Sequence, residues 1–176
     1  MREPVRGVSR SAILAVLLAP LLFAPSPTVQ AADASVPLVD PRLGPLVQRT
    51  VERAVERFQS PTCSMLLTDF TDLRTGESLA ATLLASGRTA SGFLGSLRFV
   101  DADHMVQCRR RPAYAWIPVG GDVVFVCTSR FTTLVKKNEW LAGNILVHET
   151  LHSLGLGENP PSSEAITEMV GRRCGR

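Results

Sequence analysis

Histidine and cysteine are scarce in this chain of 176 residues, which contains three histidines and four cysteines. No two cysteines have the C-x-x-C spacing, and this argues against a zinc site built from cysteines. Internal repeats and low-complexity segments are also absent, which argues against a repeat architecture. Only one tyrosine occurs, Tyr114, so few side chains are available for acid–base chemistry outside the carboxylates.

A hydrophobic run long enough to span a membrane is absent too. The uncharged stretch from Ser11 to Ala24 is interrupted by Pro20 and is shorter than the roughly 20 apolar residues that a span needs. It follows three arginines and precedes small residues that end at Ala31, which is the form of a secretory signal. We expect cleavage after Ala31 and a secreted or periplasmic protein without membrane contact; an uncleaved anchor is the alternative.

Removal of the signal changes the charge of the chain. Residues 1–31 hold three arginines and one acid, so the net charge falls from +3 to +1 and gives no support for nucleic-acid binding. The run Arg109 to Arg111 is explained by a solvated strand end as well as by a phosphate site. The length suits a signal peptide (1–31), a flexible lead-in (32–39) and a single domain (40–176).

The pattern of apolar residues predicts an α+β fold. Asp40-Pro41 begins an amphipathic helix that continues to Phe58, and Asn138 caps a final helix that Gly155 ends. Between them lie β-rich runs with turn signals. We therefore predict a small, mostly antiparallel sheet packed on helices, with a buried C-terminal helix. The predicted strands cover Ser64 to Thr68, Leu97 to Val100, Met105 to Cys108, Ala113 to Pro118 and Val123 to Cys127.

The four cysteines are scattered along the chain. In an exported protein an even number of scattered cysteines predicts disulfide bonds, here two, each worth roughly 2 to 4 kcal/mol. The spacing leaves all three pairings open. The cysteines are Cys63, Cys108, Cys127 and Cys174.

The final predicted helix carries the pattern H-E-x-x-H from His148 to His152. Positions i and i+4 lie on one face of a helix, so the two imidazoles can bind one metal ion together, while Glu149 points about 100° away and can reach a water on that ion. Apolar residues surround this helix on nearly every face, which predicts that it is buried. A divalent cation relieves the cost of burying three ionisable groups.

With these residues the chain resembles the zincin metallopeptidases. The resemblance implies that His148 and His152 bind zinc and that Glu149 is the general base. Gly155 matches the glycine of the metzincin pattern H-E-x-x-H-x-x-G-x-x-H, whose last position is here Glu158, a carboxylate that is an acceptable third ligand. A gluzincin-like arrangement is the alternative, in which a second helix after Pro160-Pro161 supplies Glu164 or Glu168 instead.

The resemblance further implies a peptide or protein substrate, hydrolysed by a zinc-bound water that Glu149 activates, in a monomeric protein. The edge strand that binds the substrate backbone in zincins would be Tyr114 to Ile117 or Val123 to Val126. Tyr114 is a candidate for stabilising the oxyanion, although packing explains it better, and no tyrosine or histidine follows Glu158. Two other functions stay open: a zinc-stabilised pseudo-enzyme with weak catalysis, and an exported binding module without metal.

Overall fold

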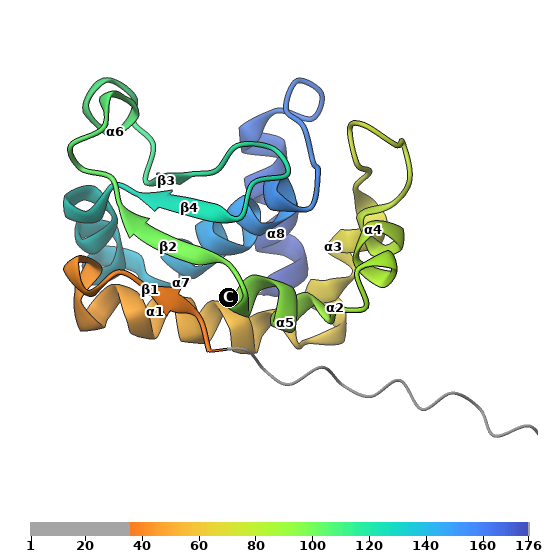
Figure 1. The fold of residues 1–176 in the computed structure, drawn as a ribbon, viewed down its shortest axis with the longest axis horizontal. Helices are drawn as coiled ribbons and strands as arrows, with labels where there is room; N and C mark the ends of the chain where they lie inside the picture. The colour runs from red at the N-terminus through yellow and green to blue at the C-terminus, as the bar shows by residue number, and fades with distance from the viewer. Residues whose placement is uncertain (1–35, 176) are drawn as a thin grey trace, which may run out of the picture. The chain divides into compact units, whose positions relative to one another are not determined.

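The structure is a computed structural model that describes residues 36–175, and Figure 1 shows its helices and strands. The expected signal peptide and residues 32–35 of the lead-in lie outside these residues. In chain order the elements are β1 (Leu38–Val39), the 3₁₀ turn η1 (Pro41–Leu43), α1 (Gly44–Phe58), α2 (Pro61–Ser64), α3 (Leu66–Asp69), α4 (Leu79–Ala85), α5 (Ala90–Gly95), β2 (Arg98–Asp101), α6 (Val106–Arg110), β3 (Ala115–Trp116), β4 (Val123–Val126), α7 (Thr128–Ser153) and α8 (Ser163–Cys174).

The first helical segment begins where the sequence predicts it. The Asp40 carboxylate accepts a hydrogen bond from the backbone N–H of Arg42 at 2.9 Å, and Pro41 occupies the first turn. The expected lead-in ends earlier than residue 39, because Val39 pairs with Phe99 and the N–H of Asp40 donates to the Phe99 carbonyl. Helix α1 then packs its apolar face against α7. Its buried residues are Val47, Thr50, Val51, Ala54 and Phe58.

The sheet has four strands in the order β1-β2-β4-β3, and the α+β class is confirmed. The predicted antiparallel character is wrong, since β1, β2 and β4 run parallel and only β3 is antiparallel to β4. Parallel neighbours need a long crossover, which α1 to α5 supply between β1 and β2, and which residues 102–122 supply between β2 and β4. The turn signals in the second crossover belong to α6 and to the β3–β4 hairpin.

Two of the predicted strands are helical. Residues 64–68 form parts of α2 and α3, and residues 105–108 lie largely in α6. A run of four or five residues is too short to show whether its apolar residues repeat with the period of a strand or of a helix. Periodicity alone could therefore not identify these two segments as helical. The other three runs overlap β2, β3 and β4.

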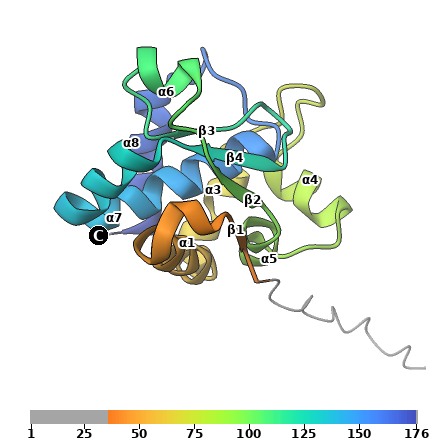
Figure 2. The same cartoon turned by 60° about the vertical axis from the view of Figure 1, so that its left-hand side comes forward.

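Helix α7 is the longest element, and it bends at Asn138. Asn138 has non-helical angles, φ −157° and ψ 79°, and its side-chain oxygen accepts a hydrogen bond from the N–H of Leu141 at 3.0 Å. The predicted cap at Asn138 is therefore confirmed, although ten further helical residues precede it from Thr128 to Lys137. In Figures 1 and 2 both α1 and α7 lie on the same side of the sheet.

Two disulfide bonds confirm the prediction from the cysteine count. They join Cys63 to Cys174 and Cys108 to Cys127. The first holds the end of α8 against α2, and the second holds α6 against the residue that precedes α7. Such bonds persist in oxidising compartments, so they indicate an extracellular type of environment. Within residues 36–175 no helix has the length and apolar character that crossing a membrane requires.

The two disulfides close loops of very different length, and this predicts unequal contributions to stability. The sequence separations are 111 and 19 residues, for which the chain-entropy relation gives about 5 and about 3 kcal/mol. Replacing Cys63 and Cys174 together by alanine should therefore lower the free energy of unfolding more than replacing Cys108 and Cys127. Urea denaturation of the two double variants measures the difference. A larger loss from the shorter loop would contradict this expectation.

Candidate metal centre

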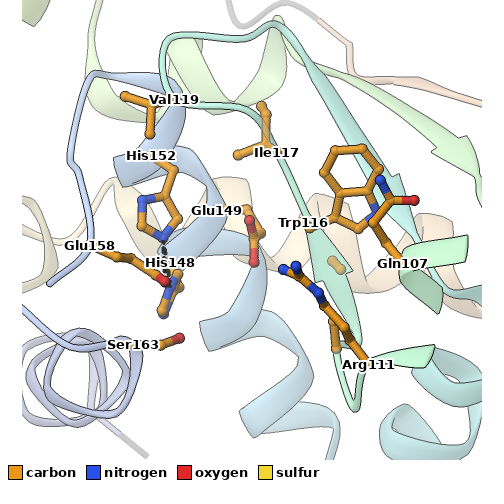
Figure 3. Close-up of a pocket in the computed structure, with 12 residues that line it drawn as sticks. Gln107, Arg111, Trp116, Ile117, Val119, His148, Glu149, His152, Glu158 and Ser163 are labelled. Atoms are coloured by element: carbon orange, nitrogen blue, oxygen red, sulfur yellow. Dashed lines mark hydrogen bonds and ion pairs between the residues drawn. The ribbon is translucent and has the colours of Figure 1, made fainter.

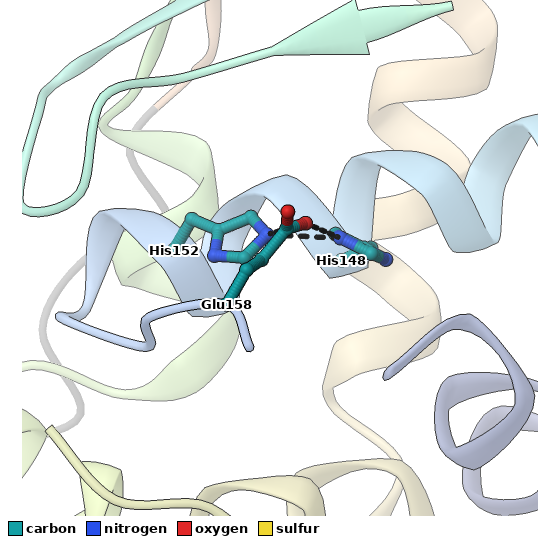
Figure 4. A group of neighbouring side chains, drawn as sticks. All are labelled: His148, His152 and Glu158. Atoms are coloured by element: carbon teal, nitrogen blue, oxygen red, sulfur yellow. Dashed lines mark hydrogen bonds and ion pairs between the residues drawn. The ribbon is translucent and has the colours of Figure 1, made fainter. Parts of the chain in front are cut away.

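The two histidines of the motif converge because α7 places them one turn apart on the same face. His148 and His152 are both buried, and their Nε2 atoms lie 2.9 Å from each other (Figure 4). Their rings meet edge to face, at an interplanar angle of 61°. Each ring therefore turns its Nε2 atom toward a common point between them.

Glu158 is the third group at this point, and it comes from the loop that follows α7. Its Oε1 atom lies 3.3 Å from His152 Nε2 and 3.8 Å from His148 Nε2. Four ligands at zinc bond lengths of about 2.0 to 2.1 Å in a tetrahedron lie about 3.3 Å from one another. The three observed separations spread around that value, so these residues fit a divalent cation. Within residues 36–175, they are the one group of three or more histidine, cysteine, aspartate or glutamate side chains that could hold a metal ion.

The loop reaches back to the histidines because of a sharp turn at Gly155. Gly155 has φ +113°, which side chains with a Cβ rarely adopt, and a Cβ there would lie 2.6 Å from the carboxylate carbon of Asp72. The N–H of Leu73 donates to the Gly155 carbonyl at 2.9 Å. Segment 71–78 therefore lies directly against the turn that presents Glu158, as the right side of Figure 1 shows.

Hydrogen bonds on the far side of each ring orient the imidazoles. His152 Nδ1 lies 2.7 Å from the carbonyl of Leu156, which can only accept, so Nδ1 carries the proton and the lone pair is on Nε2. His148 Nδ1 lies 3.0 Å from the hydroxyl of Thr167, which can accept the same kind of bond. These are the partners that metal-binding histidines usually have.

Thr167 is a site residue that the sequence analysis missed. The predicted second helix exists as α8 and packs beside α7, but it turns Thr167 toward His148. Glu164 and Glu168 are exposed, and Glu168 forms an ion pair with Arg172 instead. The sequence did contain a signal for the position of Thr167. Ile166 and Val170 are apolar residues four positions apart, and they define the inner face of α8 next to Thr167.

The electrostatics of the site favour the neutral imidazole. Burial, and after it the neighbouring His152, lowers the pKa of His148 to about 3, so this ring is uncharged at neutral pH and has a free lone pair for a cation. Burial, and after it the nearby Glu158, together raise the pKa of Glu149 to about 8, although the hydrogen bond from the backbone N–H of Ile117 acts in the opposite direction. A bound divalent cation would oppose that rise and favour the carboxylate.

Glu149 and the three candidate ligand residues line one cleft of about 520 Å³. Figure 3 shows the Glu149 carboxylate projecting into it beside the histidines, below Ile117. Tyr114 lies outside this cleft and lines a neighbouring pocket with Thr167 and Ile145. The remaining walls come mainly from α6, β3 and the residues after β3: Gln107, Arg111, Ala113, Ala115, Trp116, Ile117 and Val119.

No protein-family model, curated protein or solved structure matches this chain. The site is therefore described from its own residues: two buried imidazoles and the exposed Glu158 carboxylate, which could hold a cation, with the buried Glu149 carboxylate beside them.

The choice of third ligand can be tested with three matched variants. We expect Glu158→Gln to weaken binding of added Zn²⁺ by more than the roughly 10- to 100-fold that outer-shell changes cause. Glu164→Gln and Glu168→Gln should bind Zn²⁺ like the unmodified chain, because both side chains are exposed on α8. Competition with a coloured chelator measures the three affinities. Weaker binding by either control, with Glu158→Gln unaffected, would assign the ligand to α8.

The Thr167 contact makes a separate prediction. Thr167→Val removes the hydrogen-bond partner of His148 Nδ1, so Zn²⁺ affinity should fall by about 10- to 100-fold. Thr133→Val is the matched control, because that exposed hydroxyl bonds only to the carbonyl of Ser129 at 2.9 Å among the described residues. The unfolding free energy of both metal-free variants shows whether the change acts through folding. Equal Zn²⁺ affinity in the two variants would contradict the role of Thr167.

Proposed function

We propose that this chain is an exported zinc-dependent metallopeptidase that hydrolyses peptide bonds. The observation that carries the proposal is the convergence of His148, His152 and Glu158 at one wall of a cleft that also holds Glu149. Two histidines and one carboxylate form an established ligand set of catalytic zinc sites. The chain would then be similar to metzincins, with a glutamate in place of the third histidine.

The metal and the protein have separate tasks in this proposal. When bound, zinc supplies Lewis acidity, which polarises the scissile carbonyl and acidifies a coordinated water to a pKa of about 7. Glu149 accepts a proton from the attacking water and donates it to the nitrogen of the leaving amine. The N–H of Ile117 holds the Glu149 carboxylate at the cleft wall while this proton moves.

The substrate backbone would pair with β3. Of the two strands considered, β4 lies between β2 and β3 and has both edges occupied, whereas β3 is the last strand of the sheet. Ala115, Trp116 and Ile117 line the cleft, so the free edge of β3 borders the site directly. Addition of an extended peptide to such an edge provides backbone hydrogen bonds without requiring a particular sequence.

Replacement of the general base and replacement of a ligand should both lower hydrolysis, but they should differ in zinc content. Glu149→Gln should lower the rate of peptide hydrolysis by about 100- to 10,000-fold and leave zinc content unchanged, because the amide cannot accept the proton. His152→Ala should lose both zinc and hydrolysis. Cleavage of a mixed peptide library by mass spectrometry, together with metal analysis of the same samples, measures both quantities.

Other outcomes would identify a different function. Undiminished hydrolysis by Glu149→Gln would contradict the mechanism. Zinc in the unmodified protein without any cleavage would favour a zinc-stabilised scaffold, and a protein without affinity for zinc would favour a metal-free binding module.

A further inference from the structure

One basic side chain faces the cleft and has no partner among the residues that the structure describes. Arg111, which follows α6, is the only lysine or arginine among the described residues lining the cleft. Figure 3 shows its guanidinium directed into the cleft, on the side of Glu149 away from the histidines. Within residues 36–175 no ion pair, hydrogen bond or ring contact engages that guanidinium, so its donors are available to a ligand.

The backbone around Arg111 is held in place. The Arg130 guanidinium donates to three backbone carbonyls, those of Cys108 at 3.1 Å, Arg111 at 2.6 Å and Ala113 at 2.6 Å. The disulfide between Cys108 and Cys127 ties the same turn of α6 to the start of α7. Arg111 therefore projects from a fixed backbone, which distinguishes it from an arginine on a mobile surface loop.

The direction of β3 indicates which part of a substrate meets Arg111. The chain passes from Ala113 through β3 to Val119. The N–H of the next residue, Gly120, donates to the carbonyl of His152. A peptide added antiparallel to β3, the more stable pairing, runs the opposite way, from the Val119 end to the Ala113 end. Its residues on the C-terminal side of the scissile bond then lie beside Arg111.

We propose that Arg111 binds a carboxylate on the C-terminal side of the scissile bond and selects substrates that carry one. Gln107, one helical turn earlier, lines the same wall and can donate its amide hydrogens to that carboxylate. A guanidinium presents two parallel N–H groups that match a carboxylate. The carboxylate is either an aspartate or glutamate side chain or the free C-terminus of the peptide. This inference rests on the proposed peptidase function.

Three sets of peptides distinguish the two sources of the carboxylate. One has an acidic residue placed one, two or three positions after the scissile bond and an amidated C-terminus; the second is neutral with a free C-terminus; the third is neutral and amidated. We expect at least one carboxylate set to be cleaved with about tenfold or higher kcat/KM than the neutral amidated set. Arg111→Glu should remove this preference and favour lysine at the same position.

Arg110→Glu is the matched control, because it makes the same charge change at an exposed neighbour that does not line the cleft. We expect it to keep the preference of the unmodified protein. Peptide hydrolysis without any preference for a carboxylate, or equal effects of the two substitutions, would overturn the role of Arg111 and leave the peptidase function standing.

Binding without turnover separates this inference from the peptidase function. In the zinc-loaded Glu149→Gln protein, calorimetry should give about tenfold tighter binding of a carboxylate-bearing peptide than of the neutral amidated one. Adding Arg111→Glu should abolish the difference, and adding Arg110→Glu should not. The same difference in binding, together with no cleavage of any peptide by the unmodified protein, would support the carboxylate site while refuting hydrolysis. Equal binding of the peptides would overturn the inference even if hydrolysis is observed.

Discussion

The cost of burying three ionisable side chains in one helix is the constraint on which the rest of this structure depends. His148, Glu149 and His152 are each less than a tenth exposed in a helix whose other buried residues are mostly apolar. Unpaired polar groups in such surroundings are expensive. Each of the three side chains has a hydrogen-bond partner. His148 Nδ1 contacts the Thr167 hydroxyl, His152 Nδ1 contacts the Leu156 carbonyl, and the Glu149 carboxylate accepts from the N–H of Ile117. The two Nε2 atoms remain turned toward Glu158. A cation between them would bind both imidazoles and the Glu158 carboxylate.

Four segments far apart in the sequence hold this arrangement together. Segment 71–78 packs beneath the turn at Gly155, the hairpin at Gly120 bonds to the carbonyl of His152, and α8 supplies Thr167. The disulfide to Cys174 fixes the far end of α8 to the region of α2. The candidate ligands are thus positioned by contacts that do not involve a metal, so a cation would meet a largely formed site rather than assemble it.

The local signals in the sequence were sufficient to predict that His148, His152 and Glu158 lie together, but not to predict the residues around them. The histidine spacing, the cap at Asn138 and the glycine at position 155 each act within a few residues, so they could be interpreted without the fold. Strand direction depends on crossovers of more than a dozen residues, and helical turns of four or five residues have no distinctive period. Thr167 was missed because its place beside Ile166 and Val170 indicates the inner face of α8 but not that its hydroxyl contacts His148.

The proposed chemistry and the proposed substrate selection would be linked through α7. The helix carries Arg130 near its start, which anchors the backbone of Arg111, and His148 and Glu149 near its end. On the other wall of the cleft lie β3 and the residues next to it, and β3 is paired antiparallel with β4. The separation between the two histidines and the guanidinium is therefore set by one helix and the backbone that Arg130 anchors. A carboxylate held by Arg111 would fix the register of the peptide along β3, and with it the bond that lies nearest to Glu149.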